Sequence, residues 1–206
     1  MLRMLLIVLF SILTSCNQTM DLENLTLTEN INDFSEFLNI KNTKSIDLLL
    51  DYKFLKIEDS GEVERNKGRI IKDIYIDPSN NKVTYNNIIP NELMFRTIDN
   101  IIAYYHMDIY DAESTNMLFD YLEKKYGKGK LIFGEDNNGS QIYIWKIDNK
   151  FIRYSTIIYT NEDKDGNRVD WLGSSLVMVD ANELLKGTCP LYTSMLKQIK
   201  MPDLRE

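Results

Sequence analysis

Residues 101–127 read IIAYYHMDIYDAESTNMLFDYLEKKYG and carry the clearest structural signals in the chain. The first nine residues are rich in β-branched and aromatic side chains, which favours a β-strand. Asp111 is then a suitable cap for an α-helix in which Leu118 and Leu122 recur at helical spacing, and Gly127 is placed to end that helix. We therefore predict a strand that leads into a helix.

Downstream of this helix, three segments rich in aromatic and β-branched residues predict an antiparallel meander. Asp148 and Asn149 tolerate positive φ, as the two-residue loop of a hairpin requires. Asp180 and Glu183 have the spacing of a capping box and predict a short helix after the meander. The three strands are expected at residues 141–147, 151–160 and 169–179, and a further short helix at residues 191–199.

Upstream, Thr26 and Glu29 also have capping-box spacing, ahead of apolar residues on one helical face, so a first helix is predicted over residues 26–38. The other upstream segments are predicted from alternation and β-propensity. Strands are expected at residues 45–57 (where a helical stripe also fits), at 69–77 and 83–89 as a hairpin, and at 93–98 with a turn at Asp99-Asn100.

Strands in antiparallel succession with a few helices predict an α+β fold, an antiparallel β-sheet with a few helices packed on one face. The leucine-rich helix that ends in Tyr126-Gly127, followed by a turn and a strand with Trp145, resembles a pattern of small uncharacterised bacterial envelope proteins. This resemblance implies a type of fold and does not indicate a function. We expect one domain over residues 26–206.

The amino-terminal residues differ in character from this domain. After Arg3, the apolar run of residues 5–13 is about half as long as a membrane-spanning helix requires. The residues that follow, Leu13-Thr14-Ser15-Cys16, resemble the lipobox of bacterial lipoproteins. The resemblance implies that residues 1–15 are a cleaved signal peptide and that Cys16 carries acyl chains such as palmitate, with residues 16–25 as the lipidated cysteine and a short tether.

This resemblance also implies a location. Acyl chains on Cys16 would anchor the protein to the membrane of the bacterial cell envelope. Asn17 stands where an aspartate would, by resemblance to enteric lipoproteins, signal retention in the inner membrane, so an outer membrane is the expected destination if the organism has one. Cys189 would then have no disulfide partner, and a small buried apolar side chain explains it better than a reactive thiol.

The composition excludes some partners. The 206 residues include 24 Lys and Arg against 31 Asp and Glu, for a net charge of −7. Such an acidic balance lacks the basic footprint of nucleic-acid binding and gives no attraction to anionic lipid head groups. We therefore expect no nucleic-acid partner, and membrane attachment through the acyl chains alone.

His106 and Asp108 form the first candidate site. On a strand they point to the same face, so a histidine base with an orienting carboxylate, or two metal ligands, is geometrically possible. His106 is the only histidine, so a metal site would need distant carboxylates as well. Because a polar pair on the solvent face of a strand explains the same residues, we predict no catalytic, cofactor-binding or metal-binding residue.

A second candidate is a calcium-binding loop in the last predicted hairpin. Asn161, Asp163, Asp165 and Gly166 match positions one, three, five and six of such a loop, but Leu172 stands where a bidentate glutamate is needed. A polar hairpin tip with a glycine for the turn accounts for the segment instead.

Aromatic residues are the third candidate. Most should be core or cross-strand pairs, but an exposed cluster could bind a protein or a glycan. The aromatic residues concerned are Tyr104, Tyr105, Tyr110, Tyr121, Tyr126, Tyr143, Trp145, Tyr154, Tyr159 and Trp171.

The sequence contains no phosphate loop, nucleophile elbow or zinc signature. We therefore expect a lipid-anchored envelope protein that binds a protein or glycan partner without catalysis. An inhibitor or immunity-type protein is a sharper version, in which acidity speeds encounter with a basic partner. The alternative is an envelope hydrolase that uses carboxylates.

Overall fold

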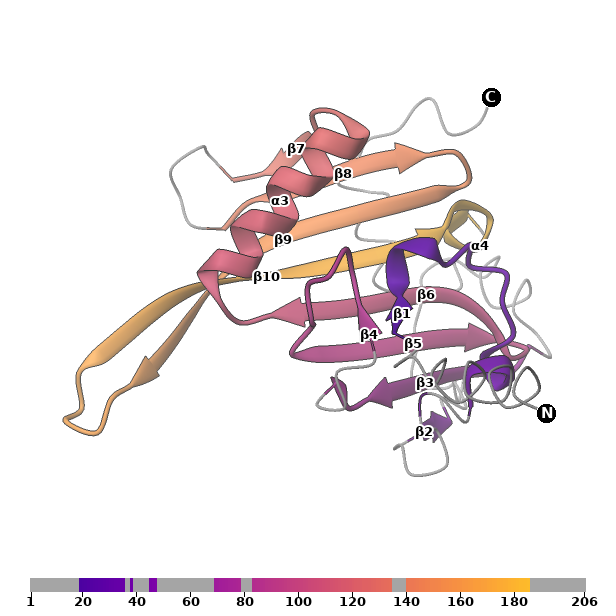
Figure 1. Cartoon of the computed structure of the whole chain (residues 1–206), viewed down its shortest axis with the longest axis horizontal. Helices are drawn as coiled ribbons and strands as arrows, with labels where there is room; N and C mark the ends of the chain where they lie inside the picture. The colour runs from indigo at the N-terminus through magenta and orange to yellow at the C-terminus, as the bar shows by residue number, and fades with distance from the viewer. Residues whose placement is uncertain are drawn as a thin grey trace, which may run out of the picture.

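The computed structural model describes residues 19–35, 38, 45–47, 69–78, 83–134 and 140–185. In this part of the chain, an eight-stranded sheet has the order β2-β3-β5-β6-β10-β9-β8-β7, and each of its strand pairs is antiparallel (Figure 1). The strands are β2 (Ser45–Asp47), β3 (Ile71–Ile76), β5 (Glu92–Ile98), β6 (Ile101–Ile109), β7 (Lys130–Phe133), β8 (Ile142–Ile147), β9 (Lys150–Glu162) and β10 (Arg168–Asp180).

The long helix forms where the sequence predicts it. In α3 (Ala112–Tyr126), the carboxylate of Asp111 accepts a hydrogen bond from the backbone N–H of Ser114 at 2.7 Å. At the other end, Gly127 has a φ of 79° and donates its N–H to the carbonyl of Glu123. Both ends therefore satisfy backbone groups that a helix leaves unpaired.

The main core lies between α3 and the sheet. Figure 1 shows α3 in front of β8, β9 and β10, and Phe119 of the helix contacts the rings of Tyr143 and Tyr154 on the sheet. Leu118 and Leu122 are fully buried in the same cluster. Burial of these side chains supplies the apolar contact that holds the helix on the sheet.

The other face of the sheet, which points away from α3, is called the back face below. A second apolar cluster lies on it, with Tyr104 and Phe151 almost fully buried. Asp73 and Arg96, on the paired strands β3 and β5, form a buried bidentate ion pair with two N–O distances of 2.6 Å. Along β6, side chains alternate between the helix face and the back face because a strand has a period of two.

The amino-terminal part of the described chain belongs to the folded domain. Met20 of β1 (Met20–Asp21) and Leu22 of the 3₁₀ helix η1 (Leu22–Asn24) are buried in the core, although the sequence assigns them to the tether. Glu23 accepts hydrogen bonds from Tyr121 at 2.5 Å and from Lys125 on α3. Burial and the bond to Glu23 raise the pKa of Tyr121 to about 12.

Two local predictions are wrong. β4 (Val83–Thr84) pairs in parallel with β1, so it does not form a hairpin with β3. The predicted helix at residues 26–38 is replaced by an extended stretch and the 3₁₀ helix η2 (Ile31–Phe34), although Glu29 accepts the capping-box hydrogen bond from Thr26. Leu27 has a φ of 66°, which lies outside the α-helical region. The Glu29 carbonyl accepts a hydrogen bond from the N–H of Ile102 on β6, so it is not available for a bond within a helix.

The fold is thus broadly the one predicted, with more sheet than expected. The described residues include two α-helices, α3 and the short α4 (Ala181–Leu185). None of the described helices has both the length and the apolar character that a membrane crossing requires. The proposed signal peptide, Cys16, Cys189, most of residues 45–57 and the predicted helix at 191–199 lie outside the described residues.

Candidate functional site

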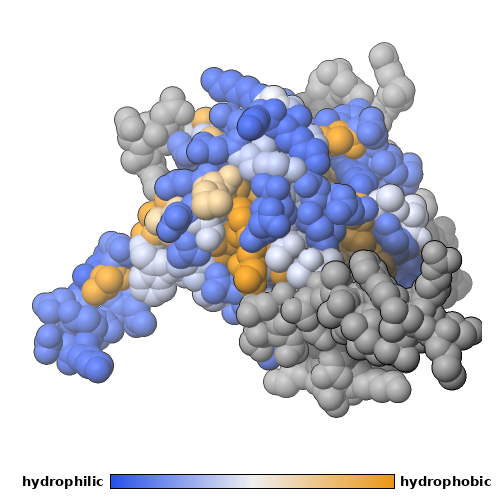
Figure 2. Space-filling model, in the orientation of Figure 1, coloured by the Kyte–Doolittle hydropathy of each residue, from blue (hydrophilic) through white to orange (hydrophobic). Residues whose placement is uncertain are grey.

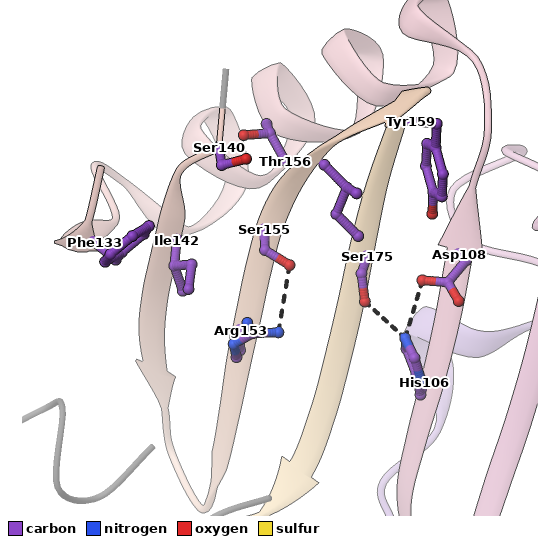
Figure 3. A pocket seen from close by; sticks show the side chains of 11 residues that line it. His106, Asp108, Phe133, Ser140, Ile142, Arg153, Ser155, Thr156, Tyr159 and Ser175 are labelled. Carbon is purple, nitrogen blue, oxygen red and sulfur yellow. Dashed lines mark hydrogen bonds and ion pairs between the residues drawn. The ribbon is translucent and has the colours of Figure 1, made fainter. Parts of the chain in front are cut away.

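His106 and Asp108 do share a face, as their spacing on a strand predicts. Both lie on the back face, where His106 Nε2 is 3.0 Å from Asp108 Oδ1. The structure adds a third polar group, because Ser175 on the neighbouring strand β10 places its Oγ 2.7 Å from the same Nε2 atom (Figure 3). The histidine side chain is 32% exposed and the aspartate 17%, so solvent reaches both.

A pocket at this place, called the back-face pocket below, is lined by residues of two cross-strand rows of the sheet. Its volume is about 340 Å³, and its lining extends from His106 on β6 to Phe133 on β7. Ser155 and Ser175, each 5% exposed, contribute hydroxyl groups to this lining. Across β6, β10, β9 and β8, one row is His106, Val177, Arg153, Ile144 and the next is Asp108, Ser175, Ser155, Ile142.

Ser175, His106 and Asp108 have the composition of a hydrolase triad but not its geometry. In a triad, the carboxylate binds the ring nitrogen that does not face the serine. Here both partners bind Nε2. A carboxylate can only accept a hydrogen bond, so the Nε2 atom carries the proton and donates it toward Asp108. A protonated Nε2 cannot take the hydroxyl proton of Ser175. The arrangement therefore fixes the imidazole ring and does not activate the serine.

Arg153 occupies the opposite side of the back-face pocket. In the described part of the chain its one hydrogen bond goes to Ser155 Oγ, at 3.3 Å, and no carboxylate forms an ion pair with it. Burial lowers the pKa of the Arg153 guanidinium from its ordinary value. Arg153 is therefore a partly buried cation in the pocket, without a counter-ion among the described residues.

An aromatic cluster borders the same pocket. Tyr159 and Trp171, register partners on β9 and β10, stack with ring centroids 5.7 Å apart, and Tyr110 meets Tyr159 edge-on at 5.0 Å. All three are partly exposed. Gly173 makes room for this cluster, because a Cβ there would lie 2.5 Å from the Tyr159 ring. Of the ten aromatic residues singled out in the sequence, Tyr104, Tyr105, Tyr143, Trp145 and Tyr154 are core residues.

β9 and β10 continue beyond the sheet as a two-stranded arm, defined here as residues 157–173. In the described register, β10 pairs with β6 only from Ser174 onward, and β9 pairs with β8 only up to Ser155. Figure 1 shows the arm projecting from one corner of the molecule. Figure 2 shows a small hydrophobic area between the hydrophilic tip of the arm and the body. Ile158 and Val169, which the register places on opposite faces of the arm, are both exposed.

The arm tip is a turn held by its own hydrogen bonds. The Asp163 carboxylate accepts from the backbone N–H groups of Asn167 and Asp165, and the Asn167 bonds are the main reason that the pKa of Asp163 is lowered. Gly166 has a φ of 79°, which favours glycine. Among the described residues, no cluster of three or more His, Cys, Asp or Glu side chains could hold a metal ion. The predicted polar tip accounts for these residues.

A second pocket of about 340 Å³ lies beside α4, and its acidic residues already have partners. Glu183 forms a bidentate pair with Arg69, Asp99 accepts from the backbone of Ile70, and Asp180 caps α4. In the back-face pocket, Asp108 is the one described carboxylate. Among the described residues that line them, neither pocket thus has the pair of available carboxylates that the hydrolase alternative needs, although Glu92, the register partner of Asp108 on β5, lies beside the back-face pocket.

Arg153, Ser155 and Ser175 are site residues that the sequence does not identify. Alternation along β9 and β10 could have placed them on one face, but the bond of Ser175 to His106 joins strands almost seventy residues apart in the sequence. Comparisons with protein-family models, with curated proteins and with solved structures find no match to this chain. The geometry of the molecule therefore carries the functional conclusion.

Proposed function

We propose that this chain is a lipid-anchored binding protein of the bacterial cell envelope that holds a protein partner with its arm and performs no catalysis. The observation that carries this proposal is the arm itself. A two-stranded ribbon is marginally stable alone. This ribbon nevertheless extends into solvent with Ile158 and Val169 more than 40% exposed. Each face of the arm therefore carries an exposed apolar side chain, and Val169 lies on the same face as Tyr159 and Trp171, where apolar and aromatic groups together offer an interaction surface.

The aromatic cluster at the base of the arm supports the same proposal. Tyrosine and tryptophan are enriched at the centres of protein interfaces because they bury a large area at a low cost in entropy. Tyr159 and Trp171 hold each other in place by stacking, and the close approach of Gly173 restricts Tyr159 further. A preorganised surface of this kind loses little conformational freedom when a partner binds.

The proposed anchor would hold the folded domain close to a membrane. Residues 17–19 alone separate Cys16 from Met20, the first residue of β1. Four Cα–Cα steps span at most about 14 Å. A lipid on Cys16 would therefore hold the domain against the membrane rather than on a long tether, with an outer membrane as the proposed location. The net charge of −7 would speed encounter with a basic partner, as an inhibitor or immunity-type protein requires.

Photo-crosslinking in cells tests the binding role. A photoreactive amino acid is placed at Ile158 on the arm and, as a control, at Met117, which is 55% exposed on α3. We expect a discrete crosslinked protein from position 158 and none from position 117. Equal crosslinking from both positions, or none from either, would contradict the proposal.

Metabolic labelling tests the anchor separately. Labelled palmitate should enter the wild-type protein and should not enter the Cys16→Ala variant. If the label persists in that variant, the lipid anchor at Cys16 is wrong, whatever the arm binds.

A further inference from the structure

We infer that the back-face pocket is an anion-binding site, in which Arg153 holds a carboxylate or phosphate group of a small ligand. This inference goes beyond the proposed function, because it concerns a small-molecule site in the body of the sheet and not the arm. It rests on the lack of a counter-ion for Arg153, on the polar groups around it and on the shape of the pocket.

The other arginines of the described structure show what Arg153 lacks. Arg96 forms a buried bidentate pair with Asp73, Arg69 a bidentate pair with Glu183, and Arg168 an ion pair with Asp170. Within the described residues, Arg153 has one long hydrogen bond to a neutral hydroxyl. A guanidinium has five N–H groups in a planar fork that matches two oxygens of a carboxylate or phosphate. Most of this donor capacity is therefore available to a ligand.

The surroundings of Arg153 suit the ligand's anionic group. Ser155 and Ser175 are register partners on adjacent strands, and both line the pocket, Ser155 bonded to Arg153 and Ser175 to His106. Val177 separates Arg153 from His106 in the row, so these two charged or polar groups stand about 10 Å apart across two strand spacings. A ligand at the guanidinium can thus use the Ser155 hydroxyl, which lies two strands away from Asp108, without contact with that carboxylate.

Asp108 limits which ligands fit. Its carboxylate lies on the far side of the pocket, where it accepts from His106 and would repel a second anionic group (Figure 3). The expected ligand is therefore a small acid that carries its charge at one end and a hydrogen-bond donor at the other. A volume of about 340 Å³ is at the lower end of the range for small-molecule sites.

Thermal unfolding of the full chain in detergent micelles tests the site, with sodium acetate and inorganic phosphate as probes and sodium chloride at equal ionic strength as reference. At about 10 to 100 times its Kd, a probe that binds should raise the Tm by roughly 3–10 °C. A larger rise with acetate assigns a carboxylate, and a larger rise with phosphate assigns a phosphate group. If neither probe exceeds chloride, the inference is wrong.

Two substitutions locate the effect. Arg153→Gln should weaken the binding of the anion roughly ten-fold to a hundred-fold. The matched control Lys124→Gln removes an exposed cation from α3, on the other side of the sheet, and should respond to the anion as the wild type does. Equal anion responses in Arg153→Gln and the wild type would overturn the inference.

The Tm without added anion gives a second readout. If Arg153 has only a structural role, its replacement should lower this Tm, whereas the anion-site inference predicts a rise. Removal of an uncompensated, partly buried charge relieves a desolvation cost, so Arg153→Gln should melt at a higher temperature than the wild type. Arg153→Lys keeps the charge without the fork and should melt as the wild type does but bind the anion more weakly. A lower Tm for Arg153→Gln would assign a structural role to Arg153 and overturn the inference. Photo-crosslinking from position 158 is independent of these outcomes.

Discussion

Gly173 lies where the arm leaves the sheet, and its replacement by alanine tests how the arm is held. A Cβ at this position would lie 2.5 Å from the backbone oxygen of Ile109 on β6 and 2.5 Å from Cε2 of Tyr159. Ordinary contacts to a Cβ begin at about 3.4 Å, so one of these groups must move by about 1 Å. The Ile109 oxygen belongs to the backbone of a central strand and cannot rotate away. We therefore expect Gly173→Ala to displace the arm together with the Tyr159 ring.

The direction of the stability change distinguishes a steric clash at Gly173 from the usual effect of a Gly→Ala substitution. Where the backbone is compatible, Gly→Ala stabilises a protein by about 0.4–1 kcal/mol, because the unfolded chain loses freedom. Overpacking of a closed site costs about 1–3 kcal/mol. For Gly173→Ala we expect a net loss of roughly 1–2 kcal/mol. In a chain of 206 residues this corresponds to a fall in Tm of roughly 2–8 °C.

Thermal unfolding followed by circular dichroism measures the fall in Tm, and the near-ultraviolet spectrum reports the stack of Tyr159 and Trp171. The control is Gly166→Ala at the arm tip, where a Cβ meets no atom within 4 Å and the only cost is the positive φ of 79°. This control should leave the near-ultraviolet signal of the stack unchanged. If Gly173→Ala is as stable as the wild type and keeps the same spectrum, the close approach at Gly173 does not hold the arm.

Three further substitutions test the interactions that stabilise the fold. Asp73→Asn removes the carboxylate that forms the bidentate pair with the buried guanidinium of Arg96 and should cost about 3–5 kcal/mol in urea unfolding, whereas Asp73→Leu combined with Arg96→Met should cost much less. Asp111→Ala removes the cap of α3 and should cost about 1 kcal/mol in the same assay, so an unchanged midpoint would contradict the capping role. Partial burial raises the pKa of Glu29, but hydrogen bonds from two neighbouring threonines outweigh it, and the pKa is lowered. The stabilisation by this carboxylate is fully present above its ordinary pKa of 4.5 and is lost as the pH falls through the lower pKa of the folded state. Wild type and Glu29→Gln should therefore differ in unfolding midpoint at pH 7 and reach the same midpoint in acid.

Several elements could be predicted because their signals are local. The cap at Asp111 and the glycine at Gly127 lie within the helix that they delimit, and both work as their residue types suggest. Asp99 and Asn100 both have positive φ and connect β5 to β6 as predicted. Asp148 likewise has a φ of 49° in the turn between β8 and β9. In each of these places the interacting groups are a few residues apart, so propensity and geometry agree.

The predictions that failed depend on partners far away in the sequence. Thr26 and Glu29 form the hydrogen bond of a capping box, yet no α-helix follows. The backbone of this segment bonds instead to the start of β6, more than seventy residues downstream. The predicted hairpin failed for the same reason, because the strand at Val83 pairs with Met20 and not with its neighbour in sequence. Tertiary hydrogen bonds replaced the local ones in both segments.

The local elements that the sequence predicts are β5, β6, α3, β8, β9, β10 and α4, together with the shared face of His106 and Asp108, but not β7. These follow from side-chain period, caps and turn residues, which act over a few positions. The tertiary structure alone decided which strands are neighbours. By placing β10 between β6 and β9, it brought Ser175 to His106 and left Arg153 beside the Ser155 hydroxyl without a counter-ion among the described residues. A site made of residues from separate strands depends on sheet order and register, and no spacing within one strand records either.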